Sequence, residues 1–251
     1  MKRMEYGRDN KEVLVLLHGG GLSWWNFRKE AELLGDRFHV VLPTLDGHAA
    51  SDADFVSIEA NADRIISYID RQFGGHVLMM GGLSLGAQVL VEILTRRPDI
   101  CCYAVVESAS VIPSKLTAAA VGPTCGTCYG LIKKDWFAKM QFRSLRIRED
   151  LFEEYFRDTA VITKPNLIAF LKASAAYGLK QDLPTSGDGI RIIVGEKESG
   201  RMLKSARLLH DMLPGSRLEV KEGLHHGEYS LNLPERYVKD LVAWLPQKER
   251  T

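Results

Sequence analysis

Val77-Leu78-Met79-Met80-Gly81-Gly82-Leu83-Ser84-Leu85-Gly86 is the segment that decides the fold of this chain. Its apolar run from Val77 to Met80 is short and continuous, which is typical of a parallel strand covered on both faces. After the serine, residues 87–97 carry apolar side chains at helical spacing, at Val89, Leu90, Ile93 and Leu94. The segment therefore predicts a buried strand, a sharp turn at Ser84 and a helix.

Two glycines flank the serine in the pattern Gly82-x-Ser84-x-Gly86. In such a turn the serine adopts a strained backbone conformation, its hydroxyl projects from the sheet, and neither glycine position has room for a Cβ. The simpler interpretation is a tightly packed glycine-rich turn, or one that binds a phosphate at the helix N-terminus. The chain lacks both Gly-x-x-x-x-Gly-Lys-Ser/Thr and a Gly-x-Gly-x-x-Gly after its first strand. No nucleotide-binding signature therefore competes with a serine nucleophile.

Composition limits the class of protein. A chain of 251 residues, 45% of them hydrophobic, suits one α/β domain or one domain with an inserted subdomain. The net charge of +1, from 33 basic and 32 acidic side chains, indicates neither nucleic acid nor an anionic membrane as a partner. Residues 1–10 lack the apolar core of a signal peptide, and no stretch reaches the ~20 apolar residues of a transmembrane helix. We expect a cytoplasmic protein whose partner is a small-molecule substrate; a homodimer is compatible with the sequence.

The four cysteines fit a reducing compartment, since they are few and two of them, Cys101 and Cys102, are adjacent. Cys125-Gly-Thr-Cys128 has the spacing of a redox or zinc motif. However, no second cysteine pair or paired histidine lies nearby in the sequence to complete four zinc ligands, and the motif does not follow a strand. We interpret these thiols as structural or incidental, and expect no metal and no cofactor.

The order of predicted elements indicates a parallel, doubly wound sheet, because strands alternate with helices over the first 110 residues. The predicted strands cover residues 12–17, 37–42, 77–80, 103–106, 190–194 and 218–220. Between Pro113 and Pro184 the patterns are helical, over residues 129–142, 148–159 and 166–177. This segment predicts a helical cap at 113–184 inserted into a core formed by 1–112 and 185–251. The alternative is that these helices simply flank the sheet.

Two loops near the start of the chain carry candidate functional groups. His18-Gly19-Gly20-Gly21 follows the first buried strand, and its glycines allow backbone N–H groups to point at a common position, as an oxyanion requires. The plainer alternative is a flexible strand-to-helix turn. Asp46 and His48 follow the next strand and have the side chains of an acid and a base. Short loops of this kind commonly use Asp and Gly for turning, so we interpret both as loop residues.

Two later segments also place polar residues after predicted strands, Gly195-Glu196-Lys197-Glu198 and Gly223-Leu224-His225-His226. Together with residues 18–21 and 82–86, these segments give four motifs at strand ends, with the serine, the acid and the histidine in that order along the chain. This is the order of the α/β-hydrolase superfamily, and the chain resembles this superfamily over essentially its whole length. The resemblance implies a mostly parallel α/β-hydrolase sheet with a helical cap. It also implies a nucleophile, a base, an acid and two oxyanion-hole N–H groups, namely Ser84, His226, Glu198, Gly20 and Leu85.

Alternatives exist for the acid and for the base. The superfamily commonly has Asp where Glu198 stands, so Glu107, at the end of the preceding strand, is the main rival and Glu196 a lesser one. His225 is the rival of His226. Whichever residues act, a serine hydroxyl needs an imidazole to take its proton, and a carboxylate to orient that imidazole and stabilise its charged form.

The expected activity is cleavage of a small, largely apolar carboxylic ester through an acyl-enzyme. The predicted cap supports an apolar substrate, because it is rich in aromatic side chains. These are Trp136, Phe137, Phe142, Tyr155, Phe156 and Tyr177. A serine at the turn argues against haloalkane dehalogenases, which resemble this fold but use Asp there. Thioesterase, lactonase, amidase, carbon–carbon bond hydrolase and acyltransferase activities fit the same residues. A hydrolase-like ligand-binding protein with little or no turnover is the alternative of a different class.

Overall fold

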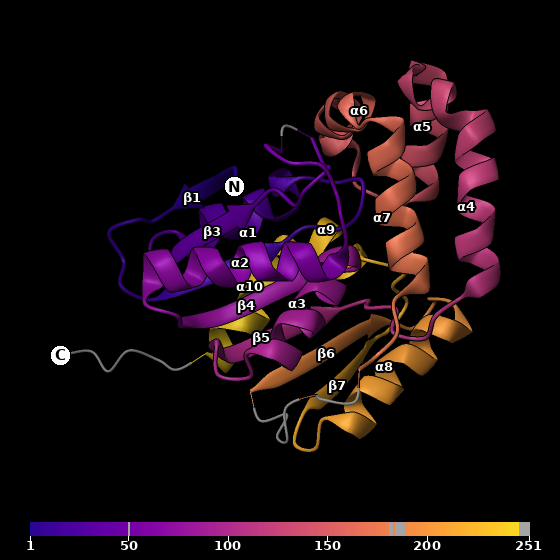
Figure 1. Cartoon of the computed structure of the whole chain (residues 1–251). Coiled ribbons are helices and arrows are strands. Elements are labelled where there is room, and N and C mark those ends of the chain that lie inside the picture. Colours follow the sequence, from indigo (N-terminus) through magenta and orange to yellow (C-terminus); the bar gives the residue numbers. More distant parts are fainter. Residues whose placement is uncertain (50, 181–182, 184–188, 246–251) are drawn as a thin grey trace.

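The computed structural model describes residues 1–49, 51–180, 183 and 189–245 (Figure 1). Its sheet has seven strands in the order β1-β3-β2-β4-β5-β6-β7. The strands are β1 (Arg3–Tyr6), β2 (Val13–Leu17), β3 (His39–Pro43), β4 (Val77–Leu83), β5 (Cys101–Glu107), β6 (Ile190–Gly195) and β7 (Arg217–Lys221). The edge strand β1 pairs antiparallel with β3, and every other pairing is parallel. The mostly parallel sheet that the sequence predicts is present.

Helices cover both faces of this sheet, which explains why inner strands such as β2 are continuous apolar runs. Along β2, for example, Val13, Val15 and Leu17 belong to one buried cluster, and Leu14 and Leu16 belong to a second. The first cluster includes residues of α2 (Ile58–Phe73), α3 (Leu85–Arg96) and α8 (Gly200–Met212). The second includes residues of η1 (Trp24–Phe27), α1 (Arg28–Leu34), α9 (Glu228–Asn232) and α10 (Pro234–Trp244). None of the described helices is both long and apolar enough to cross a bilayer.

The described elements between β5 and β6 are all helical. They are α4 (Lys115–Cys128), η2 (Tyr129–Lys133), α5 (Asp135–Ser144), η3 (Glu149–Leu151), α6 (Phe152–Val161) and α7 (Lys164–Ala176). Figure 1 shows α4 to α7 grouped together at the upper right, apart from the helices that flank the sheet. The division into a core and a cap stays a prediction, and its boundary between residues 184 and 185 lies outside the described residues.

Several hydrogen bonds connect these helices to the core, and two of them involve residues close to the sheet. The indole Nε1 of Trp25 in η1 donates to Asp158 Oδ2 of α6 at 2.9 Å, and both side chains are buried. Gln88 in α3 donates through Nε2 to the carbonyl oxygen of Ser174 in α7 at 3.0 Å. Because Gln88 lies one turn after Ser84, the helix that starts at the serine also contacts the helices above it.

The turn at Ser84 has the geometry that its two glycines predict. Ser84 has φ 53° and ψ −111°, in the positive-φ region that non-glycine residues rarely adopt. A Cβ added to Gly82 would collide with the backbone of Gly86, and a Cβ added to Gly86 would collide with the carbonyl oxygens of Leu17 and His18. The obstacles are backbone atoms and cannot move aside, so each position requires glycine.

We predict that Gly86→Ala destabilises the protein by about 3 kcal/mol or more, because overpacking against fixed backbone is not relieved by side-chain movement. Gly122→Ala is the matched control. It lies within α4, and no described atom comes within 4 Å of its added Cβ. This second substitution should be neutral or stabilise by about 0.5–1 kcal/mol, since alanine favours a helix over glycine. Urea unfolding of both variants measures the difference, and equal free energies of unfolding would contradict the packing argument.

Candidate active site

Ser84, His226 and Glu198 lie together at the carboxyl ends of the central strands. The hydroxyl of Ser84 is 3.0 Å from His226 Nε2, and His226 Nδ1 is 2.7 Å from Glu198 Oε2. The His226 side chain is 45% exposed, whereas that of Glu198 is only 1% exposed. A serine hydroxyl that substrate can reach is therefore connected through one imidazole to a buried carboxylate.

The loops that follow β6 and β7 hold this arrangement because they pack closely against each other. A Cβ on Gly195, the last residue of β6, would collide with the carbonyl oxygens of Leu224 and His225. The N–H of Lys197 donates to the carbonyl oxygen of Leu224 at 2.9 Å. Gly227 then has φ 71°, a left-handed conformation that ends the loop directly after His226. The close contact fixes the imidazole over the carboxylate.

The Glu198 carboxylate has three hydrogen-bond donors. Oε1 accepts from the Ser108 hydroxyl at 2.7 Å and from the Gly195 N–H at 2.8 Å, while Oε2 faces His226 Nδ1. Burial acts to raise the pKa of Glu198, but these donors and the charge of His226 outweigh it and hold the pKa below its ordinary value. The carboxylate is therefore ionised, accepts the Nδ1 proton, and leaves the Nε2 lone pair for the serine hydroxyl.

Ser108 is a part of the site that the sequence analysis did not single out. It directly follows β5 and has φ 55°, so its backbone is in the left-handed region. Its N–H donates to the carbonyl oxygen of Ile193 in β6 at 2.8 Å. A hydroxyl directly after a central strand, beside the strand that leads to the acid, is a signal that could have found it.

The rival residues occupy other positions. Glu107 accepts from the Ser230 N–H at 3.2 Å through Oε1, and its Oε2 has no partner within the described part of the chain. Burial raises the pKa of this carboxyl to about 7. Glu196 accepts from the Gly223 N–H at 2.8 Å. The backbone N–H of His225 donates to Glu228 Oε2 at 2.7 Å. Each of these hydrogen bonds thus involves the backbone of a loop or helix end beside the site.

The two residues whose amides are expected to bind an oxyanion, Gly20 and Leu85, are neighbours in space. Leu85 is the first residue of α3, and the first N–H groups of a helix have no carbonyl partner within it. A Cβ placed on Gly20 would be 3.6 Å from the Leu85 Cβ and 3.5 Å from the Phe170 ring of α7. The space beside these amides is thus bounded by apolar side chains, one of them from the helices between β5 and β6.

The loop that carries Gly20 is held by polar side chains that the sequence analysis did not consider. Asn26 Oδ1 accepts from the Gly19 N–H at 3.1 Å. His18 is buried, with Nδ1 2.8 Å from the Gly19 carbonyl oxygen and Nε2 3.0 Å from the Leu45 N–H. One ring nitrogen therefore donates and the other accepts, as in a neutral imidazole. Burial, reinforced by the charge of His48, lowers the pKa of His18 to about 3, which keeps the ring neutral.

Asp46 and His48 make local contacts. Asp46 forms an ion pair with Arg64 at 2.9 Å, and its carbonyl oxygen lies 2.9 Å from His48 Nδ1. The His48 ring is fully buried and packs against Phe170 with ring centroids 4.3 Å apart.

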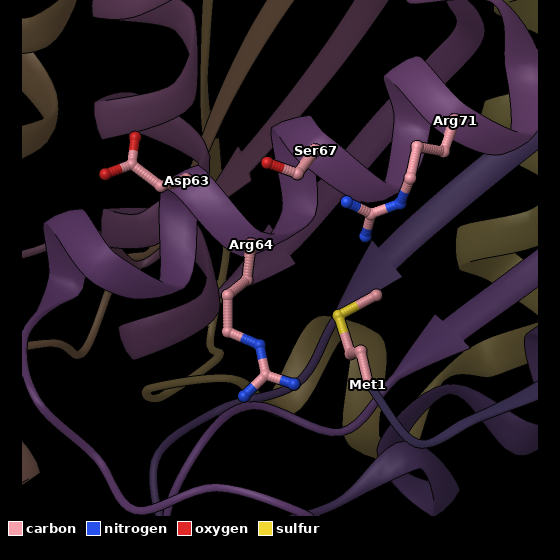
Figure 2. Close-up of a pocket in the computed structure, with 5 residues that line it drawn as sticks. All are labelled: Met1, Asp63, Arg64, Ser67 and Arg71. Carbon is pink, nitrogen blue, oxygen red and sulfur yellow. The ribbon is translucent and has the colours of Figure 1, made fainter.

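A separate cavity of about 240 Å³ lies against α2, lined by Met1, Asp63, Arg64, Ser67 and Arg71. Figure 2 shows Arg64 and Arg71 extending from the helix toward Met1. Arg64 already pairs with Asp46 and Asp52, at 2.9 and 3.0 Å. None of the lining residues belongs to the group around Ser84, so this cavity is not part of the candidate active site.

A family model described as the alpha/beta hydrolase family matches residues 14–242. The chain belongs to the alpha/beta hydrolase family. This confirms the predicted fold class, and it makes the protein a hydrolase. A relative of this hydrolase is the pimeloyl-[acyl-carrier protein] methyl ester esterase of Neisseria meningitidis serogroup C, which is 26% identical over 88% of this chain and 89% of the relative.

Solved structures share the fold of this hydrolase. The enol-lactonase from Burkholderia xenovorans LB400 superposes with a TM-score of 0.79 at 16% identity, over 98% of this chain and 96% of that one. A thermophilic esterase from Thermogutta terrifontis superposes with a TM-score of 0.78 at 17% identity, over 97% and 92% of the two chains. At such identities the likeness is one of fold.

The pKa of Glu107 predicts how the stability of the hydrolase depends on pH. The pKa of Glu107 in the folded protein, about 7, is above the ordinary value of 4.5, so the folded state binds more protons between these two values. The contribution of Glu107 to stability should therefore fall as pH rises from about 4.5 to 7 and level off above that. Glu107→Gln removes this contribution, so its stability relative to the wild type should increase by up to about 3 kcal/mol from pH 4.5 to 8.

Urea unfolding at pH 4.5, 6, 7 and 8 measures this dependence in both proteins. Parallel curves for the wild type and Glu107→Gln would show that Glu107 ionises normally in the folded state. Burial also raises the pKa of Glu30, and the charge of Glu107 adds to that shift, so Glu107→Gln should relieve part of it in the same direction.

Proposed function

We propose that this hydrolase cleaves small, largely apolar carboxylic esters through an acyl-enzyme on Ser84, with His226 as base and Glu198 as acid. The observation that carries the proposal is the position of one imidazole, 3.0 Å from the serine hydroxyl and 2.7 Å from the carboxylate. Both distances are within the range needed for proton transfer between hydrogen-bonded groups.

In this mechanism, Ser84 Oγ attacks the ester carbonyl carbon while its proton passes to His226 Nε2. The Glu198 carboxylate stabilises the imidazolium that forms, and the imidazolium then protonates the departing alkoxide. A water molecule then attacks the acyl-enzyme while its proton passes to His226 Nε2. The imidazolium returns this proton to Ser84 Oγ as the carboxylic acid leaves. The N–H groups of Gly20 and Leu85 would bind the negative oxygen of each tetrahedral intermediate, a contribution of roughly 3 kcal/mol per donor in comparable sites.

Two features support an apolar ester as the substrate. The side chains of Phe170 and Leu85 lie next to Gly20 and offer apolar surface to an acyl chain. The relatives named above include a methyl ester esterase, an esterase and an enol-lactonase, all of which act on acyl–oxygen bonds. Thioesters, amides, carbon–carbon bonds and acyl transfer fit the same three side chains and belong in the same substrate panel.

Substitution of the serine and the two adjacent histidines tests the proposal with p-nitrophenyl acetate and butyrate. We expect Ser84→Ala to lose measurable turnover and His226→Ala to lose about 10³-fold or more in kcat, because each removes a group that the chemical step needs. His225→Ala is the matched control and should stay within about tenfold of the wild type. A larger loss in His225→Ala than in His226→Ala would reverse the assignment.

The same assay separates an enzyme from a binding protein. If the wild type turns over no substrate of the panel faster than Ser84→Ala does, the chain is a binding protein with a hydrolase fold, and the proposal is wrong.

The choice of acid is tested by removing one charge at a time. Glu198→Gln should lower kcat by about 10³- to 10⁴-fold, because an amide no longer fixes the imidazole tautomer or stabilises the imidazolium. Glu107→Gln should change kcat by less than about tenfold, since its amide oxygen can still accept from the Ser230 N–H. Steady-state kinetics with p-nitrophenyl butyrate measures both, and a larger loss in Glu107→Gln would assign the acid to Glu107.

A further inference from the structure

A second imidazole contacts a nucleophilic side chain at the opposite end of the strands from Ser84. Cys102 lies near the start of β5, and His76 directly precedes β4. The distance from His76 Nε2 to Cys102 Sγ is 3.2 Å, and His76 Nδ1 is 2.7 Å from the carbonyl oxygen of Asp99. The register explains the contact, because β4 and β5 pair in parallel with Val77 opposite Cys101. Alternation then places the neighbours His76 and Cys102 on one face.

The hydrogen bonds of His76 define the direction of proton transfer. A carbonyl oxygen can only accept, so Nδ1 carries the proton that is donated to Asp99. In the neutral imidazole this leaves the lone pair on Nε2, which faces the Cys102 sulfur. The thiol therefore donates its proton to an imidazole that is already oriented to receive it, in the arrangement that activates nucleophilic cysteines.

Small molecules can reach this thiol. Cys102 and His76 are both exposed. They line a surface cavity of about 180 Å³ together with Lys11, Glu12 and Leu78. None of these residues belongs to the group around Ser84.

We propose that Cys102 is a reactive thiol, with His76 as its base, that exchanges with low-molecular-weight disulfides such as glutathione disulfide. The Cys102 proton moves to His76 Nε2, and Sγ attacks one sulfur of the disulfide. The disulfide bond breaks, and the departing thiolate takes the proton back from the imidazolium. The products are a mixed disulfide on Cys102 and one free thiol. This site goes beyond the proposed hydrolase function and does not rest on it.

The other cysteines serve as internal controls. Cys101 is adjacent in sequence but on the other face of the sheet, and burial raises the pKa of its thiol to about 12. Cys125 is buried in α4. Cys128 is partly exposed, and its sulfur is 3.5 Å from the Thr127 hydroxyl. All four thiols are free, so each can report its own reactivity.

Peptide mass mapping after timed incubation with glutathione disulfide measures the rate at each cysteine. We expect Cys102 to react faster in the native protein than in the same chain unfolded in urea, because exposure alone cannot increase a rate beyond that of an unfolded thiol. We expect His76→Gln to slow native Cys102 about tenfold or more while the rate at Cys128 stays unchanged. Continued protection of the buried Cys125 shows that the variant has kept its fold.

Either of two results would overturn the proposal: a native Cys102 that reacts no faster than in the unfolded chain, or a Cys102 whose rate His76→Gln leaves unchanged. Repeating the mapping in Ser84→Ala separates the two sites. Because Ser84 does not contribute to the thiol pair, that variant should give the wild-type rate at Cys102 whatever the outcome of the esterase assays.

Discussion

The close approach of α3 to β2 and β4 is the constraint on which the rest of the structure depends. The backbone of Gly86 lies so near the carbonyl oxygens of Leu17 and His18 that a single methyl group does not fit. This contact forces the chain to turn within one residue, and Ser84 takes up the strain at φ 53°. The same contact places Leu85 beside Gly20, so the turn at Ser84 also brings together the two residues proposed to form the oxyanion hole. The packing of α3 against the sheet thus positions Ser84, Leu85 and Gly20 together.

The parallel sheet supplies the remaining groups, because the carboxyl ends of its strands meet at one edge. β4 leads to Ser84, β5 to Ser108, β6 to Glu198 and β7 to His226. β5 lies between β4 and β6 in the sheet, and the hydroxyl of Ser108 at its end donates to Glu198. Glu198 is ionised although it is buried, since three donors compensate the lost hydration. Glu107 is more deeply buried and has only one described donor, and burial raises its pKa to about 7. Deeper burial and fewer donors together distinguish Glu107 from Glu198.

The sequence predicts those features whose cause is local. Glycines at 82 and 86 and the apolar run before them are sufficient to predict the turn, and the spacing of Ile65 and Ile69 is sufficient for α2. Helix α4 escaped prediction because its apolar residues follow no helical period, it contains Pro123, and only Cys125 among its residues is buried. The residues alone do not choose between Glu198 and Glu107, since both follow sheet strands, and only the family resemblance favours Glu198. The hydrogen bond from Ser108 to Glu198, which joins segments 90 residues apart, supports Glu198 as the proposed acid.

The most direct test of the account is covalent labelling with a fluorophosphonate, followed by peptide mass mapping. The reagent reacts with a serine only when a base removes its proton and nearby donors stabilise the resulting adduct. The account predicts a single adduct on Ser84 in the wild type, a much slower adduct in His226→Ala, and none in a folded Ser84→Ala protein. Labelling of Ser84→Ala at the wild-type rate, or a folded wild-type protein that takes no label, would contradict it.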